Sequence, residues 1–360
     1  MTPIILAVHQ DPVPFRGSDG HVHLVYELWL TNFSSAAATV ERAQIIGDGI
    51  VLQTLDAKDV ATQLQPAGLR KPSATMASGT QSLLFLDVIL PTGSATPHRL
   101  SHHVEAHFDA APPGHQDITT TLAGIGIDRR RVAVIGPPLK GDNYISADSC
   151  CGSSRHRRAA LPVDGAVWLS QRFAVDWEQL NSENKVYDGA KETLTDYTIY
   201  GKPVLGVADG TVVTAINDQP DAPPGDFPPG LTLEQVDGNA VILNIGGGNY
   251  ALYAHMQPGS IRVKVGDHVT RGQVIGLVGN SGNTIAPHLH FQVMDRPESI
   301  ASNGLPYAID SYRVTAITPG TEKFDGAEAN GTPLELAPVS PVRHVVSGLP
   351  LDQLIISFGG

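Results

Sequence analysis

Apolar and polar side chains alternate along several short stretches in the first third of the chain. The clearest covers residues 23–31, where every second side chain is apolar: Leu24, Tyr26, Leu28 and Leu30. Residues 39–46, 82–90 and 102–108 repeat this pattern. A period of two predicts strands that bury one face. Their spacing over residues 1–135 predicts an immunoglobulin-like β-sandwich.

Helical periodicity is scarce, so the whole chain is predicted to be all-β. A length of 360 residues with 41% hydrophobic side chains favours two domains. Residues 136–165 are rich in Gly, Pro and Arg and are interpreted as a linker, and residues 166–317 form the second predicted domain. A C-terminal extension, 318–360, ends in a strand-like run that can pair back onto one of the domains. The proline-rich insertion 218–230 is expected to stay irregular.

Charge and hydropathy narrow the classes of partner. The chain has 24 basic and 36 acidic residues, a formal charge of -12, which disfavours binding to nucleic acid. No apolar run approaches the roughly 18 residues that a transmembrane helix needs. No signal peptide is visible at the start, which leaves the compartment open.

The two cysteines, Cys150 and Cys151, are adjacent. They cannot form the disulfide framework of a small secreted domain. Neighbouring Cα atoms lie closer together than an unstrained disulfide prefers, so free thiols are the simpler expectation.

Polar side chains with zinc-binding potential interrupt three apolar runs of the second domain. Asp176 lies within residues 173–177, His255 ends the run 250–255, and His288 and His290 flank a leucine. On a strand the last two imidazoles share a face. Imidazole and carboxylate groups are suitable zinc ligands, and a catalytic zinc keeps a position open for water.

The wording GNSGNTIAPHLHF, preceded by YAHM and by a series of Gly-rich hairpins, resembles the lysostaphin-type (LytM-like) glycyl-glycine endopeptidases. The resemblance covers residues 163–314. It implies an antiparallel β-sheet domain like the duplicated hybrid motif, bound zinc and a peptide substrate from bacterial peptidoglycan. It also implies an extracytoplasmic location, periplasmic or secreted.

Carried over residue by residue, the resemblance makes Asp176 and His290 zinc ligands. It makes His255 and His288 the imidazoles that act on the attacking water and the tetrahedral intermediate. The family's first ligand, a histidine four residues before the aspartate, is replaced here by Arg172. Arginine offers no lone pair and repels a cation, so Arg172 cannot be a ligand.

Two explanations of the missing ligand stay open. If residues 172–176 form a strand, Arg172 faces the same way as Asp176 and could fill the place of the metal. Alternatively, a ligand comes from the loop that holds Cys150, Cys151 and His156, which offers thiolate and imidazole groups.

Three functions follow from these observations. The first is a zinc-dependent metalloendopeptidase that acts on cell-wall peptides. The second is a degenerate LytM-like module that binds wall peptides or a partner protein without cleavage. The third makes the N-terminal sandwich the functional part, as an adhesion or targeting domain.

Overall fold

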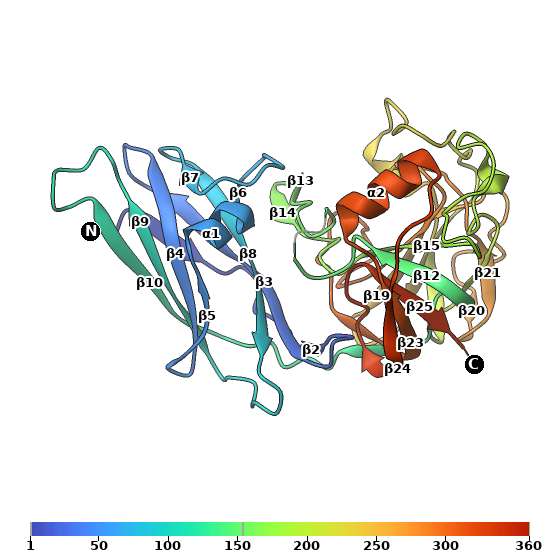
Figure 1. The fold of residues 1–360 in the computed structure, drawn as a ribbon, viewed down its shortest axis with the longest axis horizontal. Helices are drawn as coiled ribbons and strands as arrows, with labels where there is room; N and C mark the ends of the chain where they lie inside the picture. The colour runs from blue at the N-terminus through green and yellow to red at the C-terminus, as the bar shows by residue number, and fades with distance from the viewer. Residues whose placement is uncertain (1, 153–154, 360) are drawn as a thin grey trace. The chain divides into compact units, whose positions relative to one another are not determined.

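The computed structural model describes residues 2–152 and 155–359 (Figure 1). The chain folds into two compact units, 1–132 and 133–360. Almost all regular structure is β-strand, and the strand pairs are antiparallel apart from one parallel pair between named strands. The all-β prediction is confirmed. No helix in the described part of the chain is both long and apolar enough to cross a bilayer.

The first unit consists of two antiparallel sheets, one in the order β1-β3-β8-β6 with β2 beside β3, the other in the order β10-β9-β4-β5 with β7 beside β4. The four alternating stretches predicted from the sequence correspond to β3, β4, β8 and β9. The elements are β1 (Ile4–Ala7), β2 (Phe15–Arg16), β3 (Val22–Asn32), β4 (Ala38–Gly47), β5 (Ile50–Leu55), α1 (Ala57–Gln63), β6 (Leu64–Pro66), β7 (Thr75–Met76), β8 (Gln81–Leu90), β9 (Leu100–His107) and β10 (Asp117–Ile125).

Both sheets of the first unit contribute to one apolar core. Leu24 and Leu28 of β3 are buried in it together with Val40 of β4 and Val104 of β9. Two sheets that bury their inner faces against each other form a β-sandwich. The immunoglobulin-like connection of its strands stays a prediction.

The second unit is built on one long sheet, in the order β11-β23-β25-β12-β15-β22-β19-β18-β17-β20, with β24 beside β23. Its elements are β11 (Ala133–Ile135), β12 (Gly141–Ala147), β13 (Leu161–Val163), β14 (Ala166–Trp168), β15 (Val175–Gln179), the 3-10 helix η1 (Leu194–Asp196), β16 (Pro203–Leu205), β17 (Gly210–Ile216), η2 (Leu233–Gln235), β18 (Asn239–Asn244), β19 (Tyr250–Met256), β20 (His268–Val269), β21 (Val274–Leu277), β22 (Leu289–Met294), β23 (Tyr307–Ile317), α2 (Thr321–Asn330), β24 (Ala337–Gly348) and β25 (Leu354–Phe358).

The structure differs from the predicted linker 136–165, because β12 lies within it and is an inner strand of the long sheet. β12 pairs with β15 on one side and with β25 on the other. Tyr144 and Ile145 are fully buried there. The C-terminal extension thus returns to the second unit through β25. The local Gly, Pro and Arg content does not reveal this strand, because its partners come from distant parts of the sequence.

The insertion 218–230 is irregular, as predicted, and it is tied to the loop before β22. The amide of Ala222 donates to the carbonyl of Asn280, and the side-chain amide of Asn280 donates back to the carbonyl of Ala222. The amide of Gly225 donates to the carbonyl of Ile285. The insertion is therefore fixed beside the loop that leads into the two predicted site histidines.

Candidate metal centre

Three neighbouring strands of the long sheet bring the predicted site residues together. β15 pairs with β22 so that Asp176 lies opposite His290, and β22 pairs with β19 so that His290 lies opposite Ala254. His255 follows at the end of β19, and His288 lies one residue before β22. The register therefore places one carboxylate and three imidazoles at the same end of three strands.

Asp176 is the centre of this cluster. Its carboxylate oxygens lie 2.9 Å from Nδ1 of His290, 3.3 Å from Nε2 of His288 and 3.2 Å from Nε2 of His156. The ring centroids of His156 and His290 are 4.8 Å apart. Of the three substitute ligands that the sequence offered, the structure thus brings His156 to Asp176. The exposed fraction of these four side chains is between 5% and 18%.

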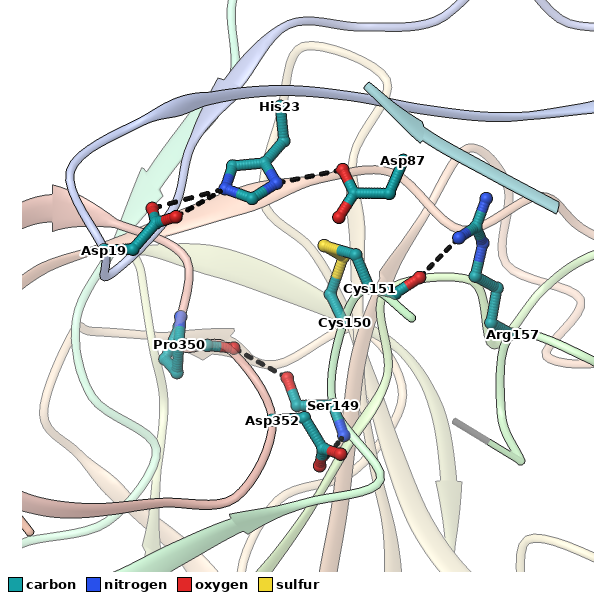
Figure 2. Close-up of a disulfide and its surroundings, with 9 residues drawn as sticks. All are labelled: Asp19, His23, Asp87, Ser149, Cys150, Cys151, Arg157, Pro350 and Asp352. Carbon is teal, nitrogen blue, oxygen red and sulfur yellow. Dashed lines mark hydrogen bonds and ion pairs between the residues drawn. A yellow bond between two sulfur atoms is a disulfide. The ribbon is translucent and has the colours of Figure 1, made fainter. Parts of the chain in front are cut away.

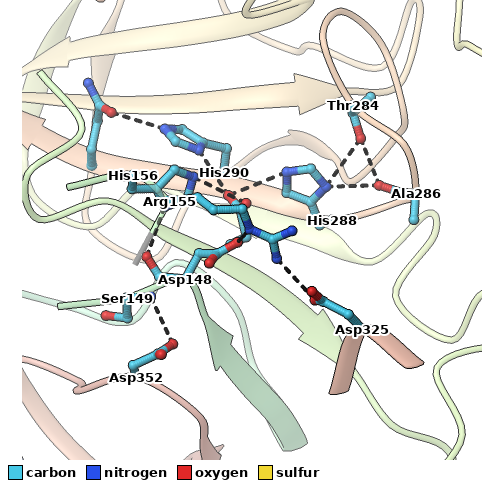
Figure 3. Close-up of polar contacts among 12 residues, drawn as sticks. Asp148, Ser149, Arg155, His156, Thr284, Ala286, His288, His290, Asp325 and Asp352 are labelled. Carbon is cyan, nitrogen blue, oxygen red and sulfur yellow. Dashed lines mark hydrogen bonds and ion pairs between the residues drawn. The ribbon is translucent and has the colours of Figure 1, made fainter. Parts of the chain in front are cut away.

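The outer nitrogen of each imidazole faces an oxygen acceptor. Nδ1 of His156 donates to the carbonyl of Asp148 at 3.0 Å, and Nδ1 of His288 donates to the carbonyl of Ala286 at 2.8 Å (Figure 3). Nε2 of His290 lies 3.0 Å from Oε1 of Gln292. A carbonyl oxygen only accepts, so Nδ1 of His156 and Nδ1 of His288 each carry a hydrogen, and Gln292 can accept one from Nε2 of His290.

The ring of His255 also donates to a carbonyl oxygen. Its Nδ1 donates to the carbonyl of Ser281 at 2.8 Å, and its ring centroid lies 4.8 Å from that of His288. Its backbone has a φ of 61°, an uncommon value for a residue other than glycine. The Ser281 loop approaches closely because the next residue is Gly282, where a Cβ atom would lie 2.4 Å from the backbone nitrogen of Gly238.

The inner nitrogens of neutral imidazoles therefore point lone pairs at a carboxylate. Such an arrangement is repulsive unless a cation lies between the groups, either a proton or a metal ion. Donor atoms of His156, Asp176 and His290 all lie within 4.8 Å of one another. A tetrahedral zinc with bonds of about 2.1 Å holds its ligands about 3.4 Å apart. The residues present fit a zinc ion.

The charged groups of the cluster shift one another's pKa values. Burial opposes ionisation of Asp176, but His156 and His288 hold the pKa of its carboxyl well below the ordinary value. Burial likewise works against charge on His156, but Asp176 and Asp148 outweigh it and raise the pKa of His156 to about 9. Burial, together with His288 and His290, holds the pKa of His255 well below 6.5.

Two sequence hypotheses about the missing ligand need correction. Cys150 and Cys151 are joined in a disulfide, so neither offers a thiolate (Figure 2). Arg172 is not on a strand, because it lies in a turn that ends before β15 begins. It is 6% exposed, and its guanidinium donates to the carbonyl of Gly304 at 3.4 Å. Residues 172–176 therefore do not form the strand that would place Arg172 on the same face as Asp176.

Sequence reasoning missed three groups near the cluster: Gln292, Glu178 and Glu328. Gln292 follows His290 by two positions, so the period of the strand could have placed both on one face. Glu178 follows Asp176 in the same way and is 6% exposed. Burial and the neighbouring Glu328 of α2 raise the pKa of Glu178 well above its ordinary value. No local signal links Glu328, 150 positions further along the chain, to this site.

Comparisons with known proteins match part of the second unit to a peptidase family. The model of peptidase family M23 matches residues 193–302, a range that contains His255, His288 and His290. The peptidoglycan DD-endopeptidase ShyA of Vibrio cholerae is 29% identical over 195 residues, which are 49% of this chain and 41% of that protein. Endolysin 2638A of Staphylococcus phage 2638A is 32% identical over 152 residues, which are 40% of this chain and 26% of the endolysin.

Among solved structures, the catalytic domain of the antimicrobial peptidase lysostaphin from Staphylococcus simulans has 26% sequence identity and a TM-score of 0.25. The match covers 40% of this chain and 80% of that one. The chain spans less than half the length of the two curated relatives named above. Residues 193–302 of this chain therefore contain a domain that matches peptidase family M23.

Proposed function

We propose that the second unit is a zinc-dependent endopeptidase that acts on peptidoglycan peptides, with His156, Asp176 and His290 as the zinc ligands. The observation that carries this proposal is the convergence of imidazole lone pairs on one largely buried carboxylate, each imidazole being held by an outer acceptor. His156 takes the place of the ligand that Arg172 cannot supply. The names of the relatives support the substrate class.

When bound, zinc polarises a carbonyl group and lowers the pKa of bound water. The chain's own residues supply the proton transfers. His288 and His255 lie beside each other, with ring centroids 4.8 Å apart, and their outer nitrogens donate to the carbonyls of Ala286 and Ser281. Their inner nitrogens are thus available to take a proton from the attacking water, deliver it to the leaving amine and stabilise the oxyanion.

An extracytoplasmic location belongs to this proposal, because peptidoglycan lies outside the cytoplasm. The disulfide between the two cysteines supports it, since disulfides persist mainly in oxidising compartments.

The test is zinc content together with hydrolysis of purified peptidoglycan, measured for the wild type, His156→Ala and His268→Ala. The last variant is the matched control, because His268 is exposed and lies on β20. We expect about one zinc per chain in the wild type and the control, and loss of both zinc and hydrolysis in His156→Ala. Retention of zinc by His156→Ala would overturn the ligand assignment.

The alternative is a module that binds wall peptides or a partner protein without cleavage. Arg172 at the usual ligand position and the small exposed fraction of the site side chains favour it. The same experiment separates the two functions. Zinc-loaded wild-type protein that binds peptidoglycan and releases no fragments would establish the module that does not cleave.

A further inference from the structure

The support of His156 extends from its loop to the C-terminal helix α2. The carbonyl of Asp148 accepts from the His156 ring, and the carboxylate of Asp148 accepts from Nε of Arg155 at 2.9 Å. Nη2 of Arg155 donates to Asp325 of α2 at 3.0 Å (Figure 3). One arginine thus joins the residue that orients His156 to a helix of the C-terminal extension.

The backbone of Asp148 is itself held in an unusual conformation. Its φ is 49°, a left-handed value that Asp and Asn tolerate better than most residues. The next residue is tied to the end of the chain, because Ser149 donates through its amide to Asp352 and through its hydroxyl to the carbonyl of Pro350 (Figure 2). The direction of the Asp148 carbonyl is therefore fixed from two sides by C-terminal residues.

We infer that Arg155 and Asp325 are positioning residues for the metal ligand His156, so that zinc affinity depends on α2. This inference rests on the proposed function, because it takes His156 as a zinc ligand. The Arg155 side chain is 60% exposed, and exposed ion pairs contribute little to folding stability. Partners that orient a metal ligand change metal affinity about 10-fold to 100-fold. A positioning role therefore predicts a clear loss of affinity with a small loss of stability.

The test measures zinc affinity by chelator competition, the visible spectrum of the cobalt-substituted protein and the urea midpoint for a set of full-length variants. Arg155→Ala and Asp325→Asn remove the link from either end, and Arg155→Lys restores a charge that can reach Asp148. Arg296→Ala is the matched control, because Arg296 is 46% exposed and pairs with a neighbouring aspartate outside the cluster.

We expect each link-breaking variant to bind zinc about 10-fold more weakly and to alter the cobalt spectrum. The double variant should be no weaker than the single ones, because one link is broken in all three. Arg155→Lys should recover part of the affinity, and Arg296→Ala should match the wild type.

The two proposals fail in different ways. A wild-type chain without zinc would overturn the proposed function and this inference together. Loss of zinc in His156→Ala with unchanged affinity and spectrum in Arg155→Ala would overturn only the positioning role. A drop in the urea midpoint that accounts for the whole loss of affinity would overturn it as well.

Discussion

Gln292 provides the sharpest test of how the proposed zinc site is oriented. Its side chain is 1% exposed, and its Oε1 lies 3.0 Å from Nε2 of His290. Without metal, His290 can carry its proton on Nδ1 and donate to Asp176. With zinc on Nδ1, the proton must be on Nε2, where Gln292 is the acceptor.

The variant Gln292→Leu keeps the volume of the side chain and removes this acceptor. The zinc-bound form then holds a buried N–H without a partner, which costs about 1–3 kcal/mol. The metal-free form escapes that cost by changing tautomer, so the whole penalty falls on zinc binding. The expected increase in the zinc Kd is about 5-fold to 150-fold.

The assay is competition with a chromogenic zinc chelator at neutral pH, with near-ultraviolet circular dichroism as a check on folding. Gln292→Glu is the matched control, because it keeps an acceptor for Nε2 and, like leucine, loses the weak bond from the side-chain amide to the carbonyl of Ser299. We expect this variant to bind zinc at least as tightly as the wild type. Equal zinc Kd values for folded Gln292→Leu and the wild type would refute the reasoning.

Three further predictions concern catalysis, acid stability and the thiols. His288→Ala and His255→Ala should each keep zinc and lose about 10²-fold to 10⁴-fold in hydrolysis rate, measured by release of peptidoglycan fragments. If either variant loses zinc, the histidine that it lacks is a zinc ligand instead. Burial lowers the pKa of His102 in the first unit to about 4, below the 6.5 of an unfolded chain. Its neutral form is therefore favoured by folding, and about 3 kcal/mol of stability present above pH 6.5 should be lost as the pH falls towards 4. Urea unfolding of the wild type and His102→Asn at several pH values checks this. The stability of His102→Asn should depend less on pH than that of the wild type. Alkylation without reductant should leave the mass unchanged, whereas reduction should expose both cysteines.

Local patterns predicted those parts of the fold that depend on neighbours in the sequence. The alternation in residues 23–31 predicted β3 within one residue at each end. The expectation that only one face is buried was wrong, because residues 23–30 of β3 are buried on both faces. The same period placed His288 and His290 on one face, and both contact Asp176 although β22 begins only at Leu289. At these positions the strand period and the tertiary contacts place the same side chains together.

Residues 136–165, predicted as a linker, show what local sequence patterns cannot predict. Glycine, proline and arginine content describes the preference of a segment on its own, whereas β12 exists because β15 and β25 pair with it from both sides. The role of His156 depends on the same pairing, since the loop after β12 starts from that strand. No spacing in the sequence connects His156 to Asp176 as the HxH pattern connects its two histidines. The sequence also offered the two thiols as ligands, because it does not show that Cys150 and Cys151 form a disulfide.

The arginine at position 172 fits a site whose ligand comes from elsewhere. The turn that holds Arg172 packs directly on residues 303–304, where the amide of Gly304 donates to the carbonyl of Leu169. A Cβ atom on Gly304 would lie 2.7 Å from the carbonyl oxygen of Ser170, so the two segments touch through their backbones. The guanidinium adds a bond to the same glycine. Arg172, four residues before Asp176, thus anchors the turn that leads into β15. Because zinc imposes no directional preference through its filled d shell, an imidazole from another loop can complete the proposed site while this position serves the strand.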